Sequence, residues 1–276
     1  MATETCKLTI DGQAFAFQVE GEFSWGADQK LFVQEGNVIS KTDWTERGYG
    51  VVDAFTEEEF AALHRSVTAN ILKAIKANGI AVNEDEFRLE DYHKIVTNDK
   101  DHFEVINITR NLTNEDIDFD IELLVERFGN ELGYKLTSWV EELQKSHIQI
   151  RINRPSSLDI NPPHKDGYLS YWEDIVNVWI PVAGCNEHTS LPVAPGSHLL
   201  SEKDIYRTES KGATINGNTY YVPCILKTAQ GNLEMVRPNP KQGEALLFSP
   251  FLVHGAAVNR SQQTRVSIEL RFPKLS

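Results

Sequence analysis

Residues 246–272 read LLFSPFLVHGAAVNRSQQTRVSIELRF, and they carry the pattern that decides the predicted fold. An apolar strand runs up to His254, a polar turn spans residues 259–263, and a second strand carries Arg265 and Ser267. We expect the two strands to form a hairpin that brings Arg265 back within reach of His254. An inward-facing arginine requires an anion, and its planar guanidinium suits a carboxylate. The hydroxyl of Ser267, on the same strand face, would add a hydrogen bond to that carboxylate.

A second polar pattern lies at residues 161–170, which read NPPHKDGYLS. His164 and Asp166 are two residues apart, so in an extended segment their side chains emerge on the same side, while Lys165 points away. The prolines end the strand before them and place the pair at a strand boundary. By itself, a His-x-Asp sequence is more often an ordinary polar turn than a metal site.

Together, His164, Asp166 and His254 form a candidate metal site. Two imidazoles and one carboxylate on one face of an ion leave coordination positions open, as in non-haem Fe(II) oxygenases, whereas zinc is more often held by thiolates or in a closed shell. Arg265 close to such an iron would hold the far carboxylate of a chelating acid. The shape of 2-oxoglutarate fits that description.

Three segments of the C-terminal half, 148–153, 176–182 and 265–272, alternate apolar and polar residues, so each strand has one apolar and one polar face. One explanation is an antiparallel sheet with its polar face in water. The other is a barrel or sandwich whose apolar outside is covered by helices and whose polar face lines a pocket. Periodicity does not choose between them. The residues opposite the apolar faces are Gln149, Arg151, Asn153, Asn177, Trp179, Arg265, Ser267, Glu269 and Arg271.

The N-terminal half predicts short strands followed by helices. Residues 1–50 alternate around expected turns at residues 11–12 and 35–36. Residues 56–79 predict an amphipathic helix, with Thr56 as N-cap, Glu59 three residues on and a glycine at the C-terminus. A second helical region is expected from about 117 to 145, as two helices broken near Gly129 or Gly133.

Composition limits the class of protein. The 276 residues have 41% hydrophobic content and a net charge of -13, which argues against a nucleic-acid partner. The three cysteines are far apart, no N-terminal segment of the sequence resembles a signal peptide, and no apolar run in it is long enough to cross a membrane. We expect a cytoplasmic protein with one domain over 1–276: N-terminal strands over 1–50, mainly helical support over 51–146, and a β core over 147–276 with a lid at about 199–235.

Five segments together resemble the phytanoyl-CoA dioxygenase-like family of Fe(II)- and 2-oxoglutarate-dependent oxygenases, over about residues 46–272. They are ERGYGVVDAFTEEE, HKD, VNVWIPV, LPVAPGSHLL and HGAAVNRSQQTRVS. The resemblance implies a mainly β (α+β) double-stranded β-helix of the jelly-roll or cupin type, flanked by N-terminal helices. It also implies that the polar strand faces point inward.

The resemblance places His164, Asp166 and His254 on the iron, and assigns Arg265 to the far carboxylate of 2-oxoglutarate with help from Ser267. Trp179 resembles a position near the cosubstrate, while Asn177, Gln149, Arg151 and Asn153 become candidate pocket residues. Glu269 and Arg271 are expected to pair with each other or to face solvent, and His198 is expected to be structural.

The implied reaction consumes 2-oxoglutarate and O2, releases succinate and CO2, and oxidises a small polar metabolite. Hydroxylation of a sugar or amino-acid derivative from a biosynthetic pathway is the favoured outcome, with desaturation, epoxidation or ring formation as the other outcomes of the same chemistry. An acyl-CoA substrate is disfavoured because residues 199–235 contain no basic cluster. The alternatives are a cupin-like metal-dependent isomerase or binding protein without O2 chemistry, for which Arg265 has no general use, and a catalytically inactive relative, which an intact triad disfavours.

Overall fold

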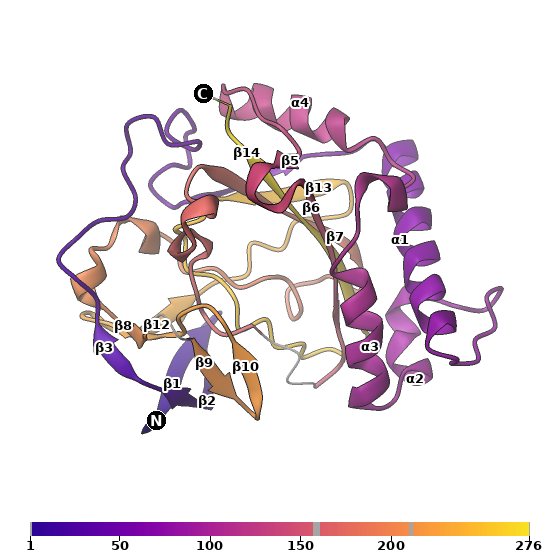
Figure 1. The fold of residues 1–276 in the computed structure, drawn as a ribbon, viewed down its shortest axis with the longest axis horizontal. Helices are drawn as coiled ribbons and strands as arrows, with labels where there is room; N and C mark the ends of the chain where they lie inside the picture. The colour runs from indigo at the N-terminus through magenta and orange to yellow at the C-terminus, as the bar shows by residue number, and fades with distance from the viewer. Residues whose placement is uncertain (1, 157–160, 210–211, 276) are drawn as a thin grey trace.

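Two β-sheets lie face to face in the computed structural model, which describes residues 2–156, 161–209 and 212–275, and helices cover the outside of one of them (Figure 1). The predicted limits of the chain's domain, residues 1 and 276, lie outside the described residues. The strands are β1 (Ala2–Ile10), β2 (Gln13–Gly21), β3 (Phe23–Trp25), β4 (Tyr49–Asp53), β5 (Trp139–Val140), β6 (Lys145–Asn153), β7 (Ile175–Ala183), β8 (Ile205–Thr208), β9 (Ala213–Ile215), β10 (Asn218–Tyr220), β11 (Ile225–Thr228), β12 (Gly231–Met235), β13 (Glu244–Phe248) and β14 (Arg265–Pro273). The α-helices are α1 (Glu57–Ala77), α2 (Tyr92–Ile95), α3 (Asp99–Thr109) and α4 (Ile121–Leu132), and the short 3-10 helices are η1 (Leu89–Asp91), η2 (Asn114–Asp116), η3 (Glu141–Leu143), η4 (Asp166–Tyr168), η5 (Ser170–Trp172), η6 (Ser197–Leu199) and η7 (Glu202–Asp204).

The six-stranded sheet has the order β4-β13-β7-β14-β6-β5. All its pairings are antiparallel, and β14 lies between β6 and β7, with Ile268 opposite both Ile150 and Ile180. The predicted hairpin of β13 with β14 is therefore wrong, because β7 separates the two strands. The segment after β13 leaves the sheet before the chain returns as β14, and side-chain alternation could not reveal this crossover.

The apolar face of the six-stranded sheet packs against the helices. Leu63, Val67 and Ile71 of α1 belong to the same buried cluster as Ile150 of β6 and Ile268 of β14. Full burial of each such side chain contributes roughly 2 kcal/mol. The polar face of the sheet thus points inward, which confirms the explanation in which helices cover the apolar face and the polar face lines a pocket. The predicted mainly β double-stranded β-helix with flanking helices is confirmed as well.

The eight-stranded sheet has the order β10-β9-β2-β1-β12-β11-β8-β3 and a separate core. Its strands β1 and β12 pair in parallel, whereas the other pairings are antiparallel. Cys6, Leu8 and Ile10 of β1 pack with Ile225 and Leu233 from the later strands. The first residues of the chain are therefore built into the sheet that faces the helix-covered one.

The predicted α1 is confirmed, including a capping box between Thr56 and Glu59. Two other expectations are wrong, and one helix was not predicted. The strands expected around residues 35–36 are wrong, because residues 26–48 form turns. The region 117–145 contains one α-helix, α4, which ends at the left-handed Gly133, and then a short strand. The helix α3 was not predicted, because its alternation of charged and apolar residues is weakly periodic.

The expected lid at 199–235 is largely sheet. Strands β8 to β12 all belong to the eight-stranded sheet, and β10, which pairs with β9, reaches the pocket described below through Asn218 and Tyr220. Within the described residues, no helix has both the length and the apolar character needed to cross a bilayer.

Candidate active site

The two segments that carry the predicted metal ligands meet in a short antiparallel bridge. The backbone N–H of His164 donates to the carbonyl of His254 at 3.0 Å, and that of His254 donates back at 3.1 Å. Gly255 permits this approach, since it has a φ of 120° and a side chain there would lie 2.5 Å from the carbonyl oxygen of Pro162. This bridge between two backbone segments thus brings together His164 and His254, which are 90 positions apart in the sequence.

His164, Asp166 and His254 offer three ligand atoms that lie within 4.8 Å of one another, and all three residues are buried. The Nε2 atom of each histidine is 3.6 Å from a carboxylate oxygen of Asp166. The structure thus brings together all three residues that the sequence predicted as metal ligands.

The hydrogen bonds of this triad aim its free atoms at a common point. The Nδ1 atoms of His164 and His254 lie 2.8 and 3.0 Å from the carbonyls of Pro162 and Leu252. A carbonyl only accepts, so each Nδ1 carries the proton and each Nε2 presents a lone pair to the centre. The Oδ2 of Asp166 is buried with no donor among the described residues. Two imidazole lone pairs and an unpaired carboxylate oxygen fit an iron ion with open coordination positions.

The charges at the centre suit a metal as well. Burial and the adjacent His164 lower the pKa of His254 to about 4, so its imidazole is neutral at neutral pH. Burial alone would raise the pKa of Asp166, but the charge of Arg271 outweighs it and holds that pKa well below its usual range. Asp166 and His254 are therefore held in the protonation states in which they bind a metal.

Arg271 fixes the other oxygen of Asp166. Its Nη2 donates to Oδ1 of Asp166 at 2.9 Å, its Nε donates to Oδ1 of Asn177 at 3.1 Å, and its Nη1 lies 2.5 Å from Nε2 of His147. The guanidinium also stacks 4.7 Å from the ring centroid of Trp172. The expectation that Arg271 pairs with Glu269 or faces solvent is wrong, since this arginine holds Asp166 in place and leaves one oxygen free.

Lys165 points away from the centre, as predicted, and is fully buried. Its Nζ donates to Oε1 of Glu202 at 2.7 Å, and Tyr168 donates to Oε2 of the same carboxylate at 2.9 Å. Glu202 begins η7, next to the eight-stranded sheet. The buried pair therefore ties the turn that carries His164 and Asp166 to the second sheet.

Arg265 is 4% exposed and has no carboxylate partner among the described residues. Its Nη1 donates to the hydroxyl of Ser267 at 3.0 Å, its guanidinium lies 5.6 Å from the ring centroid of Trp179, and its Nε has no acceptor. A buried guanidinium without a counter-ion is costly, so this arrangement fits an anionic ligand. Trp179 lies behind Arg265 and packs in a small apolar cluster with Leu246.

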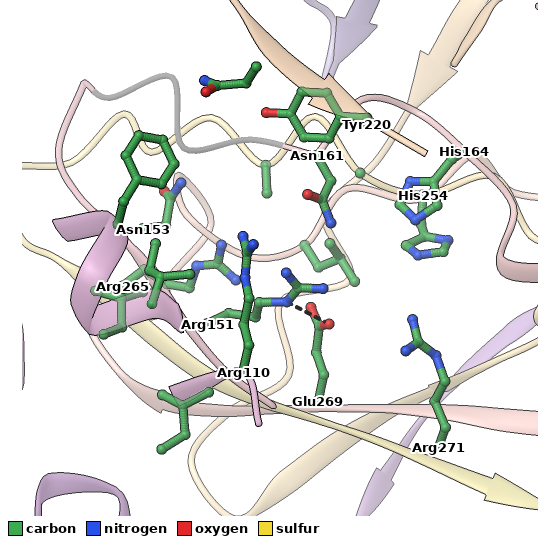
Figure 2. A pocket seen from close by; sticks show the side chains of 18 residues that line it. Arg110, Arg151, Asn153, Asn161, His164, Tyr220, His254, Arg265, Glu269 and Arg271 are labelled. Carbon is green, nitrogen blue, oxygen red and sulfur yellow. Dashed lines mark hydrogen bonds and ion pairs between the residues drawn. The ribbon is translucent and has the colours of Figure 1, made fainter. Parts of the chain in front are cut away.

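A cavity opens over these groups. Its lining includes His164, His254 and Arg265, together with Arg151 and Asn153 from β6 (Figure 2). Two other predicted pocket residues lie outside this lining. Gln149 lines the outer mouth, and Asn177 lines a small neighbouring space beside Asp166. His198 is structural as predicted, since its Nε2 binds the carbonyl of Thr45 at 2.8 Å.

The structure also adds pocket residues that were not predicted. Glu269 accepts a hydrogen bond from Arg151 at 2.8 Å inside the cavity, rather than pairing with Arg271. Arg110, at the end of α3, and Tyr220 of β10 line the mouth (Figure 2). The period of two along β14 places Glu269 and Arg271 on the same face as Arg265, so a sequence signal existed for them. Arg110 has no such signal, because only the packing of α3 beside β6 brings it there.

The fold and this centre define a metal-dependent oxygenase class, and the sequence comparison specifies the family. Residues 44–267 match the family model of phytanoyl-CoA dioxygenase (PhyH), and the chain belongs to that family. This confirms the family and the dioxygenase class predicted from the sequence. The prediction of Fe(II), 2-oxoglutarate and O2 as cofactor and cosubstrates is confirmed by family membership together with the triad.

Several solved structures are similar to this one, at low sequence identity. AviO1 from Streptomyces viridochromogenes has a TM-score of 0.49 and 15% identity over 87% of this chain and 95% of its own. EctD from S. alaskensis, with 2-oxoglutarate and 5-hydroxyectoine, has a TM-score of 0.47 and 18% identity over 92% and 83%. The carbocyclase SnoK from nogalamycin biosynthesis has a TM-score of 0.47 and 14% identity over 90% and 87%. No curated protein sequence matches the chain.

Proposed function

We propose that this protein hydroxylates a small polar metabolite, with His164, Asp166 and His254 as the ligands of Fe(II). Bound iron with 2-oxoglutarate and O2 supplies the oxidation, in which one oxygen atom enters succinate and the other enters the substrate. The unpaired Oδ2 of Asp166 and the two Nε2 lone pairs carry the ligand assignment. A sugar or amino-acid derivative remains the proposed substrate class.

The chain's own residues orient the reactants. We assign Arg265 and Ser267 to the far carboxylate of 2-oxoglutarate, with Trp179 behind the guanidinium. Arg271, held by Asn177, keeps Asp166 oriented with one oxygen directed at the metal. Gln149 and Arg151 are proposed to face the substrate side of the pocket. The wider proposal is of one oxygenase domain over 1–276, working in the cytoplasm without nucleic-acid or membrane partners.

Arg265 is buried and has no carboxylate partner among the described residues, and this observation favours an oxygenase over a cupin-like isomerase or binding protein. An isomerase has no general need of a carboxylate anchor next to the metal. Family membership supports the same choice.

The test uses the anaerobic protein loaded with Fe(II). Addition of 2-oxoglutarate is expected to produce the weak visible charge-transfer band of the chelate. Arg265→Ala removes charge-assisted hydrogen bonds of about 1.5–3 kcal/mol, so the 2-oxoglutarate concentration required should rise roughly 10- to 100-fold. The control is Arg88→Ala, an exposed arginine outside the pocket. The absence of a band in the wild type, or an unchanged requirement in Arg265→Ala, would contradict the proposal.

A further inference from the structure

The turn at residues 163–168, the HKD turn, carries two of the three candidate metal ligands and also contacts a carboxylate outside the pocket. That carboxylate belongs to Glu202, which is fully buried and is neither a member of the triad nor part of the cavity lining. Its contacts therefore call for an explanation other than ligand binding.

The two oxygens of Glu202 hold the HKD turn on both sides of Asp166. Lys165, directly before Asp166, donates from Nζ to Oε1 at 2.7 Å, and Tyr168, two residues after it, donates from its hydroxyl to Oε2 at 2.9 Å. Among the residues that the structure describes, the backbone of Lys165 takes part in no hydrogen bond, so its side chain is its polar anchor. One carboxylate thus restrains the short stretch of chain from which the side chain of Asp166 projects.

A second cation completes the surroundings of this carboxylate. Nε of Arg207 lies 3.4 Å from Oε2 of Glu202, and the guanidinium stacks 4.8 Å from the ring centroid of Tyr168. In a buried ion pair the cost of desolvation offsets most of the attraction, so apolar side chains of similar volume would serve the stability of the core as well. Charge-assisted hydrogen bonds do what apolar packing does not, because they fix both distance and direction. The arrangement therefore suits orientation of the turn better than stabilisation of the core.

The backbone around Glu202 is itself fixed. Its N–H donates to the carbonyl of Gln29 at 2.8 Å, and Gly26 permits the close approach of the two segments, because a side chain there would lie 2.5 Å from the carbonyl oxygen of Glu202. The N–H of Ile225 in β11 donates to the carbonyl of Pro163 at 2.8 Å, at the start of the HKD turn. The eight-stranded sheet and the segment after β3 thus hold the turn at its first residue and again through Glu202.

We infer that Glu202, acting through Lys165 and Tyr168, is a positioning residue of the metal centre. By holding the turn against the eight-stranded sheet, it directs the free Oδ2 of Asp166 and the Nε2 of His164 toward the ion. Glu202 itself contacts neither the ion nor the substrate. This inference rests on the proposed function, because it takes the two turn residues as ligands of Fe(II). Groups that orient metal ligands typically contribute about 10- to 100-fold in metal affinity.

The test measures the affinity of the folded protein for Ni(II) by calorimetry. The first variant, Lys165→Met with Glu202→Gln, removes both charges, keeps the length of both side chains and leaves neither charge of the pair alone in the core. We expect about tenfold weaker Ni(II) binding, because the turn loses its fixed orientation while all three ligands remain. The matched control is Lys203→Met with Asp28→Asn, an exposed ion pair at 2.9 Å whose lysine follows Glu202 in η7, and it should bind Ni(II) as the wild type does.

Two further measurements separate positioning from stability. The visible charge-transfer band of the anaerobic Fe(II) protein with 2-oxoglutarate reports the arrangement of ligands around the ion, and its maximum should shift in the double variant but not in the control. A ligand that binds only the folded state stabilises it by an amount that grows with its affinity, so Ni(II) should raise the melting temperature less in the double variant than in the wild type. A purely structural pair would lower the melting temperature equally with and without metal, and would leave the band unchanged.

Two single variants keep the inference testable if the double variant fails to fold. Lys165→Met and Tyr168→Phe each leave Glu202 two of its three partners, and each should weaken Ni(II) binding about threefold, because one hydrogen bond to the carboxylate is lost.

Ni(II) affinity and band position equal to those of the wild type in every variant that folds would overturn the inference, whatever the melting temperatures. That result leaves the proposed function intact, since the wild type would still bind Ni(II) and 2-oxoglutarate. Failure of the wild type to bind Ni(II) would instead refute the ligand assignment of the proposed function, and the inference with it.

Discussion

The pocket has a floor, formed by the metal-ligand triad and Arg271, and a mouth, to which Arg151 belongs. Each region contains a carboxylate paired with an arginine, but the surroundings of the two pairs differ. On the floor, Asp166 is almost fully buried, its Oδ1 accepts from Arg271, and its oxygens lie 3.6 Å from the Nε2 atoms of the two histidines. At the mouth, Glu269 is 21% exposed and pairs with Arg151 through one oxygen. A buried charge is costly unless partners fix it, whereas a partly hydrated one tolerates loss of its partner.

The difference indicates a division of roles. The floor is rigidly arranged, because Arg271 fixes Oδ1 of Asp166 and leaves Oδ2 free for a metal. The mouth is adjustable, because its groups retain contact with water. We therefore expect substitutions on the floor to alter metal and cosubstrate binding strongly, and substitutions at the mouth to alter substrate choice with small effects on the metal.

The largest effect is expected from Asp166→Ala. Loss of the only carboxylate of the triad should abolish Fe(II) binding and turnover, measured by calorimetry and by succinate release, while the metal-free protein still folds, with a lower melting temperature because Arg271 loses its buried partner. Asp174→Ala, an exposed aspartate with one ion pair, is the matched control. An equally severe loss of soluble protein in Asp166→Ala would show that the residue is structural.

A smaller effect is expected from Arg271→Met, which keeps much of the side-chain volume against Trp172 but frees Oδ1 of Asp166. Partners that orient a metal ligand typically contribute about 10- to 100-fold in affinity, and we expect about tenfold weaker binding of Ni(II). Titration calorimetry measures it, with Arg88→Met as control. Unchanged affinity would mean that the triad does not depend on this arginine.

The smallest effect is expected from Glu269→Gln at the mouth. Burial would raise the pKa of Glu269, but the charges of Arg151 and Arg271 outweigh it and lower the pKa below its ordinary value. The ion pair therefore stabilises the fold above the ordinary glutamate pKa, and its contribution is lost as the pH falls through the lowered one. Because the pair is partly hydrated, the difference in unfolding free energy at neutral pH should be about 1 kcal/mol or less.

Denaturant unfolding of wild type and Glu269→Gln at neutral and acidic pH measures that difference. It should shrink toward zero at acidic pH, and metal affinity should stay within about threefold of the wild type. A tenfold loss of metal affinity would place Glu269 with the floor and remove the distinction between the two regions.

Local sequence patterns predicted those features that a few neighbouring residues decide. The capping box and apolar spacing at residues 56–79 specify α1, and the period of two in residues 265–272 specifies β14 with Arg265 and Ser267 on one face. The same alternation failed around residues 35–36, where turns replace the expected strands, because short alternating runs do not by themselves find a pairing partner.

The candidate site was likewise predicted in part from the sequence and decided in part by the tertiary structure. The sequence itself determined which residues have metal-binding chemistry, because His164, Asp166 and His254 are recognisable by type and spacing together with the family resemblance. Only the tertiary structure decided that β7 lies between β13 and β14, that Arg271 rather than solvent meets Asp166, and that Arg110 reaches the mouth. The physical reason is range: alternation and capping act over a few residues, whereas strand order and helix docking depend on burial of apolar surface from distant parts of the chain.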